Sequence, residues 1–127
     1  MTLSEIKKDC QKKLKRAAQN TYQDGKQIID ESFPKFYSQG NPRRPRTYTL
    51  PGAAYTPEPM ISDNSAYIEV GYEGDQISYS DGTFTGGEVL GATMTGTYGV
   101  VGNPSYDNEA FEEIGEAVDK NFGTEFG

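Results

Sequence analysis

The sequence contains no histidine, no tryptophan and a single cysteine, Cys10. Without histidine the chain lacks the commonest zinc ligand and the usual general base of enzymes, and one cysteine cannot form an intramolecular disulfide. No segment approaches the roughly 20 apolar residues of a transmembrane helix, and the N-terminus lacks the apolar run of about 7 to 15 residues that a secretory signal needs. These absences exclude much metal-dependent and acid–base catalysis, and they predict a protein that is made in a cytoplasm and contacts no membrane.

What the sequence does contain suits one small domain. Its 127 residues fit the usual size of a single folding unit. Only 34% of the residues are hydrophobic, but nine tyrosines and six phenylalanines bring large apolar area to a small core. Fifteen glycines indicate much turn and loop. We therefore expect one domain over residues 1–127 that gains stability from partner subunits.

Charge is divided unevenly along the chain. Residues 1–46 hold eleven of the twelve Lys and Arg against five acids, a net charge of +6, whereas residues 47–127 hold only Lys120 against fourteen acids, a net charge of −13. A chain with two oppositely charged parts can direct head-to-tail contacts between its own copies, or attract a polyanion to one end. A simple solvated helix face is the alternative reading of the basic part.

Residues 1–38 are predicted to form one long, basic, amphipathic helix. From Leu3 to about Phe33 the apolar residues recur in steps of three, four and their sums, which is the period of an α-helix. Thr2 or Ser4 can cap its start. The other faces carry the basic residues Lys7, Lys8, Lys12, Lys13, Lys15 and Arg16.

The same helix is expected to be interrupted and to be too long for its domain. Gly25 weakens its middle, and Pro34 ends or kinks it. On this register Cys10 lies on the buried stripe between Ile6 and Leu14 and should behave as a small core residue. A helix of about 30 residues would be about 45 Å long, longer than such a domain is wide. Part of the apolar stripe should therefore contact another chain.

Residues 39–59 are predicted to form a proline- and arginine-rich arm. Proline at this density is incompatible with a continuous helix or a central strand, and "RTYTL", Arg46–Leu50, is the only strand-like piece expected within it. The motif PRRP also matches the PxxP spacing of polyproline ligands, a match that often arises by chance. An extended, positively charged segment of this kind cannot pack a core and is available for contacts with a partner.

Residues 60–103 are predicted to form antiparallel strands followed by a glycine-rich loop. "AYIEVGYE" alternates apolar and polar residues, and "QISYS" follows after a turn at Gly74 and Asp75, so the two segments should pair as a hairpin. A short helix is expected around residues 88–94, with the loop continuing through Gly102. The loop contains no lysine and lacks the P-loop pattern, so nucleotide binding is not expected.

Residues 104–127 are predicted to form a C-terminal amphipathic helix and tail. Its apolar stripe is Phe111, Ile114, Val118 and Phe122. Asp107 or Asn108 should cap the helix, and Lys120 and Gly123 should mark its end. The acidic residues of its first turn favour the helix dipole, so we expect them to be structural rather than metal-binding or catalytic.

Three segments resemble a known family, the neck or tail-completion proteins of tailed bacteriophages, also described as head–tail joining or minor capsid proteins. The long helix followed by an aromatic and proline-rich segment and then "RTYTL" is similar to the start of many members. "EVLGATMTGTYGVVG", residues 88–102, resembles a small-residue loop of the family, with Tyr98 where histidine is common. "NEAFEEIGEAVDKNF", residues 108–122, is similar to its closing helix.

The resemblance implies an α+β fold in which a long and a short helix flank a small twisted antiparallel sheet. It implies a structural virion protein, made in the bacterial host cytoplasm, that forms a ring such as a hexamer or dodecamer at the head–tail junction. Its partners would be the head connector or adaptor and the tail-tube or tail-terminator proteins, and DNA would pass through the ring. It implies no catalysis and no cofactor. The interface residues we expect are Arg43, Arg44, Arg46, Tyr48, Phe36, Tyr37, Lys12, Lys13 and Arg16.

Other functions stay open. Within the same class, the protein could be a tail terminator or another minor tail protein. From another class, the basic helix and the PRRPR arm could bind nucleic-acid phosphates, with nearby aromatic residues stacking on bases. A hydrolase that uses two carboxylates is a third hypothesis, although no spacing of the acids in residues 63–88 singles out a pair.

Overall fold

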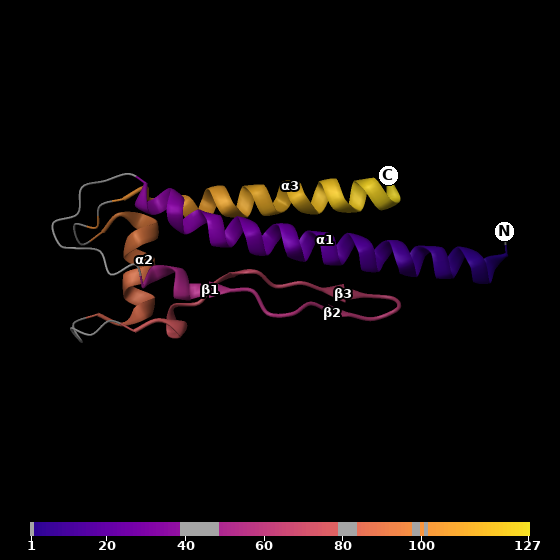
Figure 1. The fold of residues 1–127 in the computed structure, drawn as a ribbon, viewed down its shortest axis with the longest axis horizontal. Coiled ribbons are helices and arrows are strands. Elements are labelled where there is room, and N and C mark those ends of the chain that lie inside the picture. The colour runs from indigo at the N-terminus through magenta and orange to yellow at the C-terminus, as the bar shows by residue number, and fades with distance from the viewer. Residues whose placement is uncertain (1, 39–48, 79–83, 98–99, 101) are drawn as a thin grey trace.

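The computed structural model describes residues 2–38, 49–78, 84–97, 100 and 102–127. The fold is mixed α+β, as the sequence predicts, with a long N-terminal helix, small antiparallel sheets and a C-terminal helix that packs on the first. The elements are α1 (Leu3–Tyr37), η1 (Leu50–Ala53), β1 (Ala54–Tyr55), β2 (Met60–Ile61), β3 (Ala66–Tyr67), β4 (Gly71–Tyr72), η2 (Gly74–Gln76), α2 (Gly86–Thr95) and α3 (Tyr106–Phe126). Helix α1 runs the length of the molecule, with α3 on one side, the strands on the other and α2 across its C-terminal end (Figure 1).

Helix α1 begins at a capping box. The Thr2 side chain accepts a hydrogen bond from the Glu5 backbone N–H, and the Glu5 carboxylate accepts one from the Thr2 N–H, both at 3.2 Å. Pro34 does not end the helix: α1 continues through it to Tyr37, close to the predicted end at residue 38. Proline has no N–H to donate to the Asp30 carbonyl, and Asp30 is an exposed residue.

Gly25 serves a close packing contact in the middle of α1. A Cβ at this position would lie 3.0 Å from Cγ2 of Val70, so the absence of a side chain lets the strand segment approach the helix. On the same side, the Tyr22 hydroxyl donates to the Thr56 carbonyl at 2.9 Å. The glycine that weakens the helix by propensity is therefore also the place where the β segment packs against it.

The strands pair differently from the prediction. β3 pairs with β2, and β4 pairs with β1, both antiparallel, so residues 54–72 form one long interrupted hairpin. The described residues of the predicted partner "QISYS", 76–78, pair with no strand: residues Gly74–Gln76 form a 3-10 turn, and Ile77 enters the core. The predicted alternation of residues 66 to 72 is confirmed, because Ala66, Ile68, Val70 and Tyr72 are all partly buried.

One of the two partner strands, β1, lies inside the segment expected to be an arm, and the other, β2, begins directly after it. Pro57 and Pro59 interrupt the ladder between β1 and β2, which leaves two paired residues on each side of them. Leu50 and Ala53 of η1 are buried, at 2% and 0% exposure. The second half of residues 39–59 is thus part of the domain core, whereas residues 39–48 lie outside the described residues.

The predicted short helix is confirmed as α2, whose first residue, Gly86, packs on the backbone of Gly74. Thr85 and Glu88 form its capping box, with bonds of 3.1 and 3.2 Å. A Cβ on Gly86 would collide with the carbonyl oxygens of Gly74 and Ile77. The start of α2 therefore packs directly on the backbone of η2, a contact that only glycine allows at this position.

The C-terminal helix is confirmed, but its ends and its buried face differ from the prediction. Its N-cap is Ser105, which has a left-handed φ of 68° and makes no side-chain cap bond, so neither Asp107 nor Asn108 caps the helix. The helix passes Gly123 and ends at Phe126. The predicted apolar stripe is divided, since Ile114 packs against the core and Phe122 is half-buried, whereas Phe111 and Val118 are 48% and 39% exposed. The helix buries Tyr106, Ala110, Ala117 and Asn121 against α1.

The core lies at the C-terminal end of α1, where α2, α3, η1 and the base of the hairpin meet. Tyr106 is fully buried at its centre, with its ring centroid 5.3 Å from that of Phe36, 5.7 Å from Tyr72 and 6.2 Å from Phe33. Aromatic pairs at such distances add to the apolar burial. The expectation that tyrosine and phenylalanine build the core is confirmed, and the opposite end of α1 is left without a core around it.

Candidate assembly surface

The N-terminal end of α1 extends beyond every other element (Figure 1). Helix α3 reaches back only to Arg16, which pairs with Glu125, and the hairpin reaches only to Lys15, which pairs with Asp63 at 3.6 Å. The turns before this level, residues 2–13, are named here the α1 tip. A helix of 35 residues is about 52 Å long, whereas the 21 residues of α3 cover about 32 Å.

The α1 tip exposes apolar side chains. Leu3 is 82% and Ile6 is 44% exposed, and Cys10 is exposed as well. The expectation that Cys10 is a core residue is therefore wrong for the isolated chain: its helical register is as predicted, but α3 and the hairpin end before they reach it. In a single copy, the most N-terminal part of the apolar stripe has no covering element among the residues that the structure describes.

The tip stripe continues the face of α1 that α3 covers. Leu3, Ile6 and Cys10 are followed at helical spacing by Leu14, Ala17 and Thr21. Thr21 accepts a hydrogen bond from the Asn121 side-chain amide at 3.3 Å, and the same amide donates to Asp24 at 2.9 Å. The exposed stripe is thus the uncovered end of the α1 face that packs against α3.

Helix α3 carries a second, largely exposed apolar face beside the one that packs on α1. It consists of Phe111, Gly115, Val118 and Phe122, which recur at steps of four and three and are named here the α3 outer stripe. At one end of it Phe111 touches the Tyr72 ring, with ring centroids 5.9 Å apart, and at the other end Phe122 is half-buried. Along the middle of the helix, Ala110 and Ala117 are buried at 3% and 8% exposure, whereas the larger Phe111 and Val118 are 48% and 39% exposed. A Cβ on Gly115 would meet no atom within 4 Å, so the middle of the stripe is open.

The two stripes have flanks of opposite charge. Next to the tip stripe are Lys7 and Lys13, which lie three residues before and three residues after Cys10. Next to the outer stripe are Glu112 and Asp119, which lie three residues before and four residues after Gly115. Lys13 pairs with Asp9 of its own helix at 3.1 Å. Within the described part of the chain, the other three flanking charges make no ion pair.

Arg16 joins α1 to the last turn of α3 rather than facing a partner. Its guanidinium donates two hydrogen bonds of 2.9 Å to the two oxygens of Glu125. This hydrogen bonding, followed by charge attraction, raises the pKa of Arg16, and bonding to Arg16 lowers the pKa of the Glu125 carboxyl. Of the three basic helix residues expected at an interface, Lys12 is exposed on the side away from the tip stripe, and Lys13 and Arg16 are paired within the chain.

The aromatic residues expected at the interface lie mainly in the core. Phe36 is 4% exposed, and Tyr37 packs against it with ring centroids 5.4 Å apart. Phe36 is therefore not available on the surface of a single copy. The remaining expected residues, Arg43, Arg44, Arg46 and Tyr48, lie outside the described residues.

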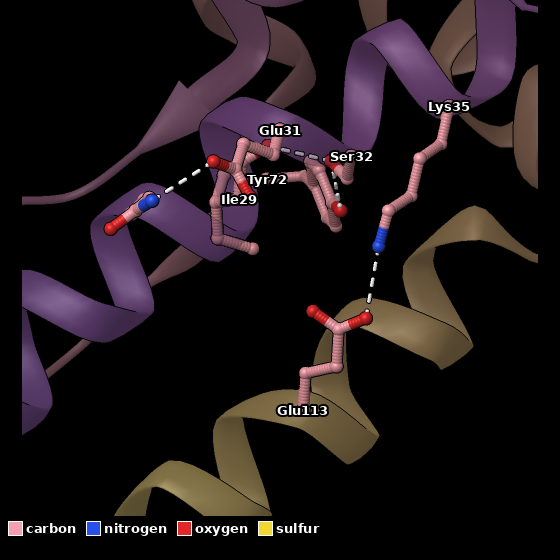
Figure 2. A network of polar contacts seen from close by, with 7 residues as sticks. Ile29, Glu31, Ser32, Lys35, Tyr72 and Glu113 are labelled. Carbon is pink, nitrogen blue, oxygen red and sulfur yellow. Dashed lines mark hydrogen bonds and ion pairs between the residues drawn. The ribbon is translucent and has the colours of Figure 1, made fainter.

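A shallow cleft of about 330 Å³ runs between α1 and α3. Its walls carry acidic residues and one lysine: Asp24, Glu31, Glu113, Glu116 and Lys120. Lys35 reaches across from α1 to Glu113 of α3 at 2.9 Å (Figure 2), and this hydrogen bond raises the pKa of Lys35. The described residues include no group of three or more acidic or cysteine side chains placed to hold a metal ion.

The polar network beside this cleft is structural (Figure 2). The Tyr72 hydroxyl donates to Ser32 Oγ at 2.7 Å, and Ser32 donates to the Ile29 carbonyl at 2.6 Å. Burial raises the pKa of Tyr72 to about 12. These bonds fix the hairpin base to α1.

No protein-family model matches the chain, and neither a curated protein nor a solved structure is significantly similar to it. None of the helices in the described part of the chain has a stretch apolar and long enough to cross a lipid bilayer. The outer stripe was visible in the sequence as an apolar period, but the period alone does not say whether such a face meets the chain's own core or a partner.

Proposed function

We propose that this protein is a structural virion subunit of a tailed phage or prophage that assembles into a ring at the head–tail junction. The observation that carries the proposal is the uncovered apolar stripe of the α1 tip, where Leu3, Ile6 and Cys10 are exposed beyond the end of α3. Side chains such as leucine and isoleucine gain about 1.5 to 3 kcal/mol each on full burial. A second chain that covers the tip would bury these side chains, and their burial would stabilise the assembly.

The phage assignment within this proposal is supported by the sequence resemblance of three segments, residues 46–50, 88–102 and 108–122, to neck proteins. The overall charge pattern is compatible with it, because a basic end and an acidic helix on one chain favour repeated contacts of one orientation. The arm around Arg43, Arg44 and Arg46 would add a second contact to a neighbouring subunit or virion protein.

Nucleic-acid binding is the second candidate, and one observation favours it. Lys7, Lys8 and Lys12 are exposed on the α1 tip and make no ion pair with any residue that the structure describes. Phosphate contacts of this kind would weaken steeply as salt is raised. Exposed leucine and isoleucine among these lysines are better explained by a protein partner, which is why we rank assembly first.

The experiment that tests the proposed function measures particle mass. Light scattering of the purified protein, alone and mixed with candidate adaptor and tail proteins, should show ring-sized particles, with ring images by electron microscopy. Replacing Leu3 and Ile6 by glutamate should prevent assembly without lowering the melting temperature, since both side chains are exposed in the single chain.

The matched control replaces Met60, which is 67% exposed on the hairpin, by glutamate. This change adds an exposed charge in place of an exposed apolar side chain, as the tip variant does, but it lies on another surface and should leave assembly unchanged. A wild-type protein that stays monomeric at high micromolar concentration and does not bind the candidate adaptor and tail proteins would refute the proposed function.

A further inference from the structure

We infer that the α1 tip of one copy packs into the α3 outer stripe of a neighbouring copy, so that the subunits join head to tail through these two helices. The inference rests on the proposed function and specifies the contact that builds the assembly. The tip stripe is Leu3, Ile6 and Cys10; the outer stripe is Phe111, Gly115, Val118 and Phe122.

The tip stripe matches the first part of the outer stripe, Phe111 to Val118, in length and shape. Leu3 and Cys10 are seven residues apart, as are Phe111 and Val118, which gives about 10 Å of helix in each case. The middle of the tip stripe is the bulky Ile6, and the middle of the outer stripe is the bare backbone of Gly115, where a side chain would meet open space. Packing a large residue of one helix into a gap on another is the geometry by which helices associate closely.

Charge selects this pairing over the two symmetric ones. The α1 tip has four lysines against Glu5 and Asp9, a net charge of +2, and residues 106–127 have seven acids against Lys120, a net charge of −6. A tip-to-tip contact would bring two sets of lysines together, and a stripe-to-stripe contact would bring Glu112 and Asp119 of two copies together. Only the contact between unlike surfaces places Lys7 and Lys13 beside Glu112 and Asp119.

The occupant must be another copy rather than the same chain. The tip is the straight continuation of a helix that α3 already packs against through a different face, Ala110, Ala117 and Asn121. The tip begins where α3 ends, at the level of the Arg16–Glu125 pair. One tip and one outer stripe on each copy form a heterologous contact, which propagates from copy to copy and closes into a ring when the rotation allows.

A charge exchange tests the contact. One variant, Lys7→Glu with Lys13→Glu, reverses the flanks of the tip, and a second, Glu112→Lys with Asp119→Lys, reverses the flanks of the outer stripe. Each alone should raise the concentration needed for half assembly by about tenfold or more, because attractions become repulsions at several positions. An equimolar mixture of the two should assemble about as well as the wild type, since every tip then finds a stripe of opposite charge on the other variant.

The control variant is Lys8→Glu with Lys12→Glu. It makes the same charge change on the far side of the tip and should assemble nearly as the wild type does. Melting temperatures of all variants should stay close to that of the wild type, because these side chains lie on the surface. As a second measurement, Cys10 should react with a maleimide rapidly in the dilute monomer and slowly in the assembled mixture.

Each outcome decides the matter. Assembly of the mixture with failure of both variants alone supports the contact. Normal assembly of either variant alone, or failure of the mixture while the wild type still assembles, overturns it and leaves the proposed function standing. A wild-type protein that never assembles defeats the proposed function itself.

Discussion

Replacing Tyr106 by phenylalanine should lower the free energy of unfolding by about 1 kcal/mol, the net value of one buried hydrogen bond. The Tyr106 side chain is fully buried, and its hydroxyl lies 2.8 Å from Oγ1 of Thr93. Thr93 donates its own proton to the Leu90 carbonyl at 2.7 Å. The Tyr106 hydroxyl is therefore the donor to Thr93, and phenylalanine removes that donor without changing the ring.

Replacing Thr93 by valine should cost more than replacing Tyr106. Valine has nearly the shape of threonine, but it leaves the buried Tyr106 hydroxyl without its acceptor, and an unsatisfied buried polar group costs about 1 to 3 kcal/mol. In the double variant both hydroxyls are gone and nothing is left unsatisfied between them. Its loss should be smaller than the sum of the two single losses by about 1 kcal/mol.

Urea denaturation of the four proteins at one concentration measures these differences, with unchanged slopes to show that the folded state is the same. The control is Tyr67→Phe, since Tyr67 is 55% exposed and its hydroxyl donates to the exposed Glu69. That change should stay within about 0.5 kcal/mol. Additive losses, with no coupling beyond about 0.3 kcal/mol, would show that the hydroxyl pair does not hold α2 to α3.

Three further predictions concern other parts of the chain. Gly86→Ala should destabilise the fold by about 2 kcal/mol, because its Cβ would meet the backbone of η2, whereas Gly87→Ala, which has open space, should be neutral or slightly stabilising in thermal melts. Burial raises the pKa of Tyr72 to about 12, so the contribution of Tyr72 to stability should be complete below pH ~10 and be lost as the pH rises toward 12. Ultraviolet titration of the wild type and of Tyr72→Phe tests this. Identical titration curves at high pH would contradict it. Replacing Arg43, Arg44 and Arg46 by alanine should keep the circular dichroism spectrum and melting temperature while blocking assembly; a variant that unfolds would show that these arginines pair within their own chain.

The long helices could be predicted because their signal is repeated over many turns. The apolar period of residues 3 to 33 gave the register of α1 correctly, yet it placed Cys10 in the core. Burial depends on where the covering elements end, and the ends of α3 and the hairpin at Arg16 and Lys15 are set by tertiary packing. Periodicity identifies a face of a helix but does not identify what covers it.

The hairpin and α3 show two other limits. Pro57 and Pro59 argued against a strand, but they fall between β1 and β2 and interrupt the ladder without preventing it. In α3 the predicted apolar stripe is not the face that packs most closely on α1, because that face carries the small residues Ala110 and Ala117. Periodicity therefore found Phe111 and Val118 but did not show that both stay exposed.

The separation in sequence between α1 and the helix that covers it has a consequence for synthesis on the ribosome. Thr21 and its hydrogen-bond partner Asn121 are 100 residues apart, and Arg16 and Glu125 are 109 apart. At translation rates of about 5 to 20 residues per second, α1 is made roughly 5 to 20 seconds before α3. During this interval its whole apolar face, and not only the tip, is open to chaperones and to other nascent chains of the same polysome. Early association of the wrong faces is therefore a hazard of translation, and slowing synthesis of the α3 segment should lower the yield of folded protein.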